Sequence, residues 1–371
     1  MNDCLLPTEN CLRAPAPAAP PPSEGAGGRC SFLLGKTLSE LTAVAEQAGL
    51  PAFAGKQMAD WLYRKKVATI AEMSNLPKAA RAALSAQYEV GGFAPVKVQR
   101  SQDGVKKYLF PTLSGNFIET VMIPEAERAT LCVSSQAGCR MGCRFCMTAR
   151  QGFQANLSAG EIIAQFSRSE ECGHLTNAVY MGMGEPLDNI DEVLKSLEIL
   201  TAPWGWAWSP RRITVSTIGV LPSLRRFLDE SRCHVAVSLH DPFAAGRQEL
   251  MPMQKAWPLS GVIALLKQYD FSGQRRVSFE YILFAGVNDS PRHASELAGL
   301  LRGLECRVNL IRFHPIPGSP LRPAGEAQLE QFKNHLLRQG LLTTICASRG
   351  QDISAACGLL STEGREGITK N

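Results

Sequence analysis

The chain has 371 residues, a formal net charge of +5 and an apolar fraction of 45%, values that suit a folded protein with a sizeable core. It contains no run of about twenty apolar residues and starts without the pattern of a signal peptide, so we expect neither a membrane span nor export. Twelve irregularly spaced cysteines differ from a compact disulfide framework and favour a reducing cytoplasm.

The first hundred residues change character twice along the chain. Residues 1–34 include a Pro/Ala tract and several glycines, a composition that favours a disordered tail. Between residues 37 and 88 the apolar spacing is helical, with breaks at Pro51 and Pro77. We therefore expect a small helical accessory domain over residues 35–95.

Strand patterns follow the helical region. Residues 108–110 and 117–123 have strand character and are separated by a turn at 114–116, so residues 96–131 are predicted to form a linker and a β-hairpin. A further strand-like run at residues 130–134 leads directly into a cysteine-rich loop.

Beyond residue 133, short apolar runs alternate with amphipathic helical patterns. The strand-like runs are residues 178–181, 212–216, 235–239, 276–283 and 307–313, and the helical patterns are residues 159–169, 191–200, 221–230, 260–269, 291–302 and 326–339. This alternation predicts a parallel α/β barrel or partial barrel over residues 132–360, with active residues at the carboxyl ends of its strands. Residues 361–371 are predicted to be a second tail.

Three cysteines follow the first predicted barrel strand. Cys139, Cys143 and Cys146 have the spacing C-x3-C-x2-C. A structural iron–sulfur cluster or zinc ion normally takes four protein ligands, so three thiolates leave one iron open to a small molecule. Gly138 and Gly142 suit a tight loop whose amides approach the cluster sulfides. A zinc site or three unrelated buried cysteines are the alternatives.

Further candidate residues stand at the ends of the predicted strands. They are Gly184, Glu185, Ser216, Ser238, Leu239, His240 and His314. Glycines at a strand-to-helix turn expose amides and carbonyls that can hold a ligand, although they also serve the turn alone. Serine and histidine at strand ends commonly cap helices, so a structural role is the alternative for them.

The cysteine trio, the glycine-rich run at residues 182–187 and the α/β repeat resemble radical S-adenosylmethionine (SAM) enzymes. Four more runs are similar to the RNA adenine methyltransferases of the RlmN/Cfr family. They are residues 119–125, 130–136, 151–153 and 352–358, in the family's order. The resemblance covers residues 38–359 and implies a partial (β/α) radical SAM barrel with a small N-terminal helical domain and a β-hairpin extension.

By this resemblance, the chain methylates carbon 2 of adenosine through a thiol carrier. That carbon is electron-poor and SAM is an electrophile, so a radical route is required. The resemblance implies that Cys357 takes a methyl group from one SAM, that a second SAM is cleaved at one [4Fe-4S] cluster on the trio, and that Cys132 releases the product by forming a disulfide with Cys357. Glu119 matches the family's proton acceptor. Considered alone, the two cysteines are more typical of buried small hydrophobes and Glu119 of a solvent-facing strand residue.

The strand-end candidates match the family's SAM contacts, and His314 stands where the family often has Asn, an amide of different reach and charge. The resemblance also implies 23S rRNA and tRNA as partners, an electron donor such as flavodoxin or ferredoxin, and a cytoplasmic monomer. Basic residues at 64–66, 106–107, 211–212 and 275–276 can neutralise RNA phosphates, or they form ordinary solvated faces.

Two other functions compete with this one. A Cfr-type enzyme uses the same cysteines and methylates carbon 8, but residues 151–153 look more like the carbon-2 enzymes. A metal-bearing RNA-binding or assembly protein without catalysis is the third possibility. The presence of Cys132, Glu119 and Cys357 together argues against it, because a binding module needs no such set.

Overall fold

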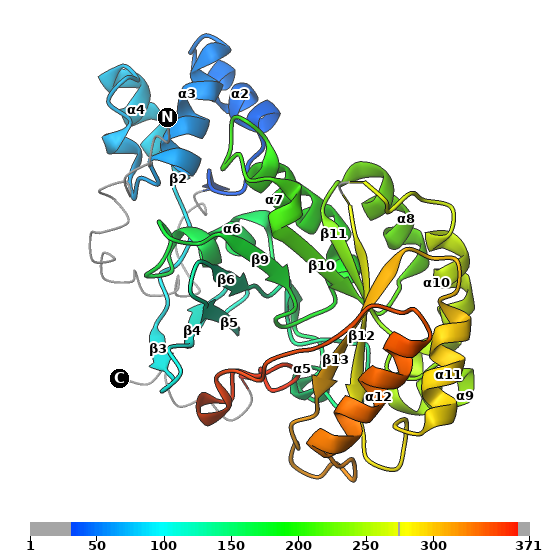
Figure 1. Cartoon of the computed structure of the whole chain (residues 1–371). Helices are drawn as coiled ribbons and strands as arrows, with labels where there is room; N and C mark the ends of the chain where they lie inside the picture. The colour runs from blue at the N-terminus through cyan, green and yellow to red at the C-terminus, as the bar shows by residue number, and fades with distance from the viewer. Residues whose placement is uncertain (1–30, 274, 363–371) are drawn as a thin grey trace.

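The computed structural model describes residues 31–273 and 275–362 (Figure 1). Its centre is a ten-stranded sheet in the order β14-β13-β12-β11-β10-β9-β6-β5-β4-β3. The strands from β6 to β14 pair in parallel, whereas β3, β4 and β5 continue the sheet antiparallel. The end strands β3 and β14 are not neighbours, so the described sheet is an open, partial barrel, as the sequence predicts.

The parallel strands carry the candidate site residues at or near their carboxyl ends. They are β6 (Ala129–Cys132), β9 (Asn177–Tyr180), β10 (Ile213–Thr217), β11 (His234–Ser238), β12 (Val277–Leu283), β13 (Cys306–Arg312) and β14 (Thr343–Ile345). The interior strand β12 is buried along almost its whole length because helices and neighbouring elements cover both faces of the sheet. All but β14 were predicted, and β14 is too short to give a periodic pattern.

Helices return the chain from one parallel strand to the next (Figure 1). The six predicted helices are α6 (Ala159–Ser167), α7 (Ile190–Thr201), α8 (Leu221–Glu230), α10 (Leu259–Leu266), α11 (Pro291–Leu300) and α12 (Glu326–Arg338). Helix α6 begins at a capping box between Ser158 and Glu161 and buries Ile162 and Phe166. Two short helices, α5 (Met147–Gln151) and α9 (Ala244–Leu250), were not predicted and lie next to the site.

The N-terminal helices form a group at one end of the molecule in Figure 1, where α2 contacts α7 of the barrel. They are α2 (Leu38–Gln47), α3 (Phe53–Ala59) and α4 (Lys78–Ser85), with the short turns η1 (Asp60–Arg64) and η2 (Ile70–Glu72), and the expected breaks fall between them. A Cβ on Gly55 would lie 2.5 Å from the hydroxyl oxygen of Thr42, so glycine allows α3 to pack closely on α2.

Residues 31–34 belong to the fold, although the sequence places them in the expected N-terminal tail. Strand β1 (Ser31–Phe32) pairs in parallel with β2 (Tyr88–Glu89), and the side chain of Leu33 is fully buried. This burial draws residues 31–34 into the fold, whereas the rest of the expected tail lies outside the described residues. At the other end, only Ser361 and Thr362 of the predicted second tail are described.

Two β-hairpins extend the sheet on the side of β6. Strands β3 (Lys97–Arg100), β4 (Lys106–Pro111) and β5 (Phe117–Pro124) form them, and β5 pairs with β6. The hairpin of β4 and β5 matches the predicted one. Among the described residues, no helix combines the length and apolar character that crossing a membrane requires.

Candidate active site

The cysteine loop connects β7 (Gln136–Ala137) with α5 and is closed by its own backbone. Gly138 has a φ of +71°, and a Cβ there would lie 1.7 Å from the carbonyl oxygen of Gly152. The amide of Cys139 donates to the same carbonyl at 3.1 Å. Because any side chain at residue 138 would collide with this backbone, the turn requires glycine.

The three thiols of the trio lie on this one loop, and Cys146 acts electrostatically on the other two. Burial raises the pKa of each one, and the charge of Cys146 raises the pKa of both Cys139 and Cys143 further. In the part of the chain that the structure describes, no three His, Cys, Asp or Glu side chains are grouped to hold a single metal ion. Three thiols on one glycine-shaped loop form a donor set that fits an iron–sulfur cluster, which binds them as thiolates.

The glycine-rich run after β9 packs against the chain that leads into the loop. A Cβ on Gly184 would lie 2.6 Å from the Cβ of Gln136, and the amide of Glu185 donates to the side-chain oxygen of Gln136 at 2.9 Å. The carboxylate of Glu185 accepts from the amides of Leu187 and Ile218 at 3.1 and 3.0 Å. Its side chain therefore joins two strand ends, and SAM contacts by Gly184 and Glu185 stay predictions.

Burial dominates the electrostatics of Glu185. It raises the pKa of the carboxyl to about 7, although hydrogen bonds from Thr217 and the amides of Ile218 and Leu187 act in the opposite direction. A buried carboxyl in such a position takes up its proton near neutral pH. The carboxyl of Glu185 is also near the trio, since its negative charge raises the pKa of Cys139 and Cys143.

The candidates at the ends of β10 and β11 differ in the exposure and the contacts of their side chains. Ser216 and Ser238 are half-buried, whereas Leu239 is fully buried and can offer a ligand only its backbone. His240 has a φ of +57°, and its Nδ1 accepts from the amide of Ile282 at 3.0 Å. The His240 ring packs edge-on against Phe145 of the cysteine loop, with 4.7 Å between ring centres.

His240 is neutral in this environment. Burial lowers its pKa to about 3, and the positive charge of Arg247 lowers it further. The ring, which follows β11, thus links the cysteine loop to β12, and this is a structural role for a residue predicted to contact SAM. A SAM contact by its backbone, and by Ser216, Ser238 and Leu239, stays a prediction.

His314 follows β13 and faces the C-terminal segment. Its Nε2 and the hydroxyl of Ser348 form a hydrogen bond of 2.5 Å. Burial lowers the pKa of His314, with a smaller effect from Arg312, so the ring is neutral at physiological pH. His314 therefore has a partner within the protein. The hydrogen bond to Ser348 does not test the predicted SAM contact of His314, which stays a prediction.

Cys132 and Cys357, the two cysteines assigned roles outside the trio, lie within electrostatic reach of each other. Cys132, at the end of β6, is buried, and its pKa is raised first by burial and then by the charge of Cys357. Cys357 keeps exposed surface, but surrounding protein desolvates its thiol and raises the pKa to about 11, with smaller effects from Glu280 and Cys146. Cys357 therefore lies within electrostatic reach of both Cys132 and a cysteine of the trio.

Glu119 lies on β5 and is fully buried, although its place in a strand alone would favour a solvent-facing side chain. Its Oε1 lies 3.2 Å from Nζ of Lys107, a residue of β4 that is 2% exposed. Its Oε2 accepts from the amide of Ser361 at 3.1 Å. The carboxylate thus contacts the C-terminal segment that carries Cys357.

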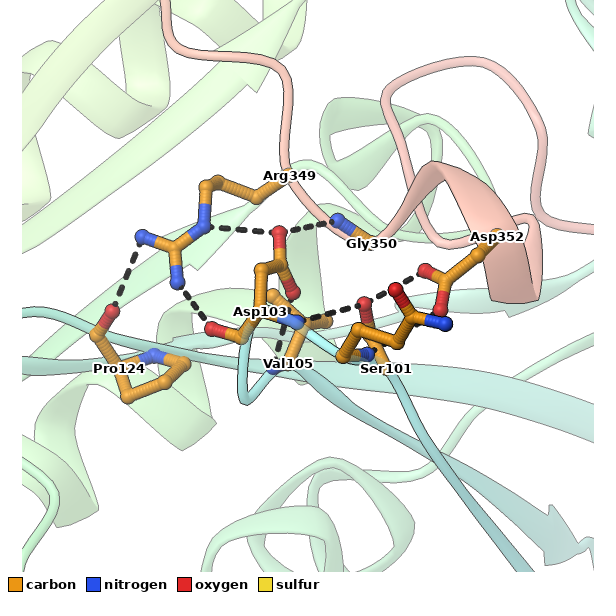
Figure 2. A network of polar contacts seen from close by, with 8 residues as sticks. Ser101, Asp103, Val105, Pro124, Arg349, Gly350 and Asp352 are labelled. Carbon is orange, nitrogen blue, oxygen red and sulfur yellow. Dashed lines mark hydrogen bonds and ion pairs between the residues drawn. The ribbon is translucent and has the colours of Figure 1, made fainter.

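Contacts from distant elements hold this C-terminal segment on both sides of Cys357. Upstream, Arg349 binds the carboxylate of Asp103 in the turn between β3 and β4, with 2.9 Å between Nε and Oδ2, and Asp352 accepts from the hydroxyl of Ser101 at 2.5 Å (Figure 2). Downstream, the hydroxyl of Thr148 in α5 donates to the carbonyl of Leu360 at 2.6 Å. Helix α5, which follows the trio, and the turn between β3 and β4 therefore both bind the C-terminal segment.

Several residues with a place in the site were not singled out from the sequence. Arg247 of α9 is buried and donates to the carbonyls of Ile218 and Ser238 at 2.8 and 2.9 Å, which fixes the ends of β10 and β11. Glu280 of β12 is buried, and its charge acts on Cys357. A buried charged residue in a strand or a short helix gives no distinct sequence pattern, which is why neither was found.

The basic residues proposed as phosphate contacts divide into three groups, of which Lys65, Lys66 and Lys106 are half-buried. Lys107 and Arg275 are buried, so they are not available to RNA in this structure. Arg64, Arg211, Arg212 and Arg276 are exposed. Sequence spacing cannot make this distinction, because adjacent residues of a strand point to opposite faces of the sheet.

Comparisons with known proteins identify the family of the chain. Residues 133–298 match the Radical SAM superfamily, and residues 32–90 match the ribosomal RNA large subunit methyltransferase N-terminal domain. A radical SAM methyltransferase from Sphaerobacter thermophilus has a similar crystal structure, with a TM-score of 0.83 and 41% identity, covering 89% of this chain and 99% of the other.

Curated relatives match over nearly their whole length. The probable dual-specificity RNA methyltransferase RlmN of Parabacteroides distasonis is 58% identical over 330 residues, which cover 89% of this chain and 96% of the relative. The dual-specificity RNA methyltransferase RlmN of Syntrophobacter fumaroxidans is 41% identical over 331 residues, which cover 88% and 97%.

Proposed function

The chain belongs to the RlmN family of radical SAM RNA methyltransferases, and we propose that it methylates carbon 2 of adenosine. The proposed substrates are an adenosine in the peptidyl-transferase region of 23S rRNA and the adenosine beside the anticodon of certain tRNAs. One observation carries the proposal: Cys357 lies within electrostatic reach of Cys132 and of Cys146 in the trio. A thiol carrier needs this placement, because it must meet both the radical source and a second thiol.

The trio provides the ligands of the proposed cofactor. Cys139, Cys143 and Cys146 would hold a [4Fe-4S] cluster through three of its irons. When bound, this cluster supplies the electron that cleaves SAM to a deoxyadenosyl radical. The proposed SAM contacts are made at the strand ends by Gly184, Glu185, Ser216, Ser238, Leu239, His240 and His314.

Cys357 is the proposed methyl carrier. Its sulfur attacks the methyl carbon of one SAM, so the methyl group becomes a thioether on the protein. The radical that a second SAM would supply removes a hydrogen atom from this methyl group, so two SAM would be used per turnover. The resulting carbon radical adds to carbon 2 of adenine, which joins the enzyme and the RNA through the sulfur of Cys357.

Release of the product requires a base and a second thiol. Glu119 is the proposed acceptor of the proton from carbon 2. It is buried and contacts the amide of Ser361, so reaching the adenine requires this contact to open. The thiolate of Cys132 then attacks the sulfur of Cys357, so the S–S bond forms and the bond between sulfur and the methylene carbon breaks. The methylene carbon takes up a proton to become the methyl group, and the unpaired electron of the adduct would return to the oxidised cluster as the RNA is freed.

The remaining parts of the chain are assigned to RNA binding and electron supply. Residues 35–95 are the proposed RNA-binding accessory domain, residues 96–131 the linker and hairpin, and residues 132–360 the barrel with its catalytic C-terminal segment. The exposed residues Arg211 and Arg212 provide positive charge for phosphates. A flavodoxin or ferredoxin would reduce the cluster, and we place the enzyme in the cytoplasm as a monomer.

Mass spectrometry of nucleosides tests the proposal. Anaerobically reconstituted enzyme is incubated with SAM, a reductant and unmodified rRNA or tRNA. We expect a gain of 2-methyladenosine. A gain of 8-methyladenosine instead would assign the chain to the Cfr-type reaction, and cleavage of SAM without any methylated adenosine would refute the proposed substrate.

Cysteine variants test the thiol mechanism in the same assay. Cys357→Ala is expected to abolish methylation, and Cys132→Ala is expected to accumulate a covalent protein–RNA adduct because nothing attacks the sulfur of Cys357. Cys346→Ala is the matched control, since this thiol also lies within electrostatic reach of Cys357 but has no assigned role. Free release of methylated RNA by Cys132→Ala would remove Cys132 from the resolving step.

A further inference from the structure

The ion pair of Lys107 and Glu119 lies on the same face of the sheet as Cys132. Lys107 of β4 stands opposite Val121 of β5, and Val121 stands opposite Cys132 of β6, so these three side chains point to one face. Glu119 precedes Val121 by two residues and therefore shares that face. The pleat of three adjacent strands thus places the proposed base, the resolving thiol and a lysine side by side.

This ion pair also joins the two ends of the segment that carries Cys357. Nζ of Lys107 donates to the carbonyl of Ser354 at 3.2 Å and lies 3.2 Å from Oε1 of Glu119. Oε2 of Glu119 accepts from the amide of Ser361 at 3.1 Å. A chain of polar contacts therefore runs from Ser354 through the two charges to Ser361, and residues 354–361 form a loop closed at its base.

The loop needs such contacts because its backbone is not regular. Ser354 has a φ of +53°, a left-handed conformation that is unfavourable for a residue with a side chain. The contacts of Arg349 with Asp103 and of Asp352 with Ser101 hold only the chain that precedes the loop (Figure 2). Lys107 instead binds the left-handed residue itself, so it fixes the point from which the loop starts.

We propose that Lys107 is a positioning residue, which holds the carboxylate of Glu119 and the loop of Cys357 as one unit so that Cys357 faces Cys132. This inference rests on the proposed function, because it assigns the geometry to the base and the two thiols of that reaction. It also replaces the surface role that the sequence predicts for Lys107, since the side chain is only 2% exposed.

The charge of Lys107 is the property that matters. If Lys107 is replaced by methionine, a side chain of similar length, the carboxylate of Glu119 loses its opposite charge and the carbonyl of Ser354 loses a donor. Both ends of the loop are then held less firmly. An arginine at the same position keeps the charge but distributes it over a planar fork, so it restores the contacts only in part.

The test measures how readily Cys132 and Cys357 meet. Anaerobic holoenzyme is oxidised with diamide, and the Cys132–Cys357 disulfide is quantified by peptide mass spectrometry, together with hydrogen exchange of the peptide that covers residues 354–361. For Lys107→Met we expect disulfide formation to slow roughly tenfold, a size within the usual coupling between contacting residues, and exchange of the loop to rise. Lys107→Arg should recover part of both losses.

A matched control removes another lysine ion pair far from the loop. Lys195 binds Glu40 at 2.6 Å between α7 and α2, so Lys195→Met should leave the disulfide rate and the loop exchange unchanged. In single-turnover assays, Lys107→Met should lower the rate of methylation while the affinity for RNA is retained. A general loss of stability would instead affect both variants in the same way.

Equal disulfide rates and equal loop exchange in Lys107→Met and the unmodified enzyme would overturn the inference. If Lys107→Met does not fold, the double variant Lys107→Met/Glu119→Gln removes both charges and leaves no unpaired one, and the same two measurements decide. Neither measurement needs RNA or methyl transfer. Suppose the unmodified enzyme does not methylate adenosine, but Lys107→Met still slows disulfide formation and raises loop exchange. This result would refute the proposed function and leave the inference about Lys107 standing.

Discussion

The cysteine loop and the C-terminal segment contribute to one site, but they are held in different ways. The loop is closed by residues near it in the chain, as the contact between Cys139 and Gly152, the residue after α5, illustrates. The segment around Cys357 is held by residues that are far away in sequence, since Arg349 and Asp103 are 246 residues apart. The first arrangement is a property of local backbone geometry, whereas the second exists only after the sheet has formed.

Because the two regions are held differently, substitutions in them should have different effects. A change within the cysteine loop should remove the cofactor site and leave the position of Cys357 largely intact. A change in the hairpin turn or in α5 should displace Cys357 and leave the trio intact. If either substitution affected the cofactor site and the position of Cys357 equally, the two regions would not be held independently.

Removing a thiol of the trio should have the largest effect. In Cys143→Ala, two thiolates remain, which are too few to retain the proposed cluster. We expect iron and sulfide content after anaerobic reconstitution to fall to background, with complete loss of methylation, while hydrogen exchange of residues 354–361 stays unchanged. Cys306→Ala, on β13, serves as the control and should reconstitute normally. Full iron content in Cys143→Ala would show that these thiols are not the ligands.

Much of the cysteine loop could be predicted because its signals are local. The spacing of Cys139, Cys143 and Cys146 and the two glycines Gly138 and Gly142 are visible in one short stretch of chain. The partial barrel was equally accessible, since each strand and helix has its own apolar period. In both cases, neighbouring residues alone carry the information.

The contacts of the C-terminal segment could not be predicted in this way. Lys106 and Lys107 look alike in the sequence. Only the pleat and pairing of β4 leave Lys106 half-buried and direct the buried Lys107 to the carbonyl of Ser354. His240 was assigned to SAM by resemblance, but its left-handed backbone directs the ring to Phe145 and Ile282. Register and backbone conformation are set by the whole sheet, so no short pattern reveals them.

A smaller effect is expected from enlarging the turn of the cysteine loop. In Gly138→Ala, the new Cβ would meet the carbonyl oxygen of Gly152 at 1.7 Å, so the backbone must shift. We expect the free energy of unfolding in urea to fall by about 3 kcal/mol, from steric overlap and the unfavourable φ together. Gly115→Ala has a similar φ but open space around the Cβ, so it should lose only about 1 kcal/mol. Equal losses would mean that the close approach to Gly152 does not contribute.

The smallest effect should come from the turn that binds the C-terminal segment. Burial acts to raise the pKa of Asp103, but hydrogen bonds from the Gly350 amide, Ser101 and Arg349 outweigh it and hold the pKa well below its usual range. A lowered pKa in the folded state means that the contact stabilises the fold above the unfolded pKa of about 4 and that this stabilisation is lost as the pH falls further. Since both side chains are about one-third exposed, Asp103→Asn should lower the free energy of unfolding at pH 7 by only about 1 kcal/mol.

The pH dependence distinguishes this contact from a general surface effect. The difference in stability between Asp103→Asn and the unmodified protein should shrink as the pH falls below about 4, because the unfolded carboxyl then binds a proton while the folded one stays ionised down to its own lower pKa. Asp270→Asn is the control: this carboxylate also has a lowered pKa, but its bonds reach only Ser272 in its own turn, so it should not change hydrogen exchange of residues 349–352. Raised exchange there in Asp103→Asn, with unchanged iron content, would show that the hairpin turn holds the segment of Cys357 independently of the cysteine loop. Unchanged exchange would mean that Lys107 and α5 suffice to hold the segment.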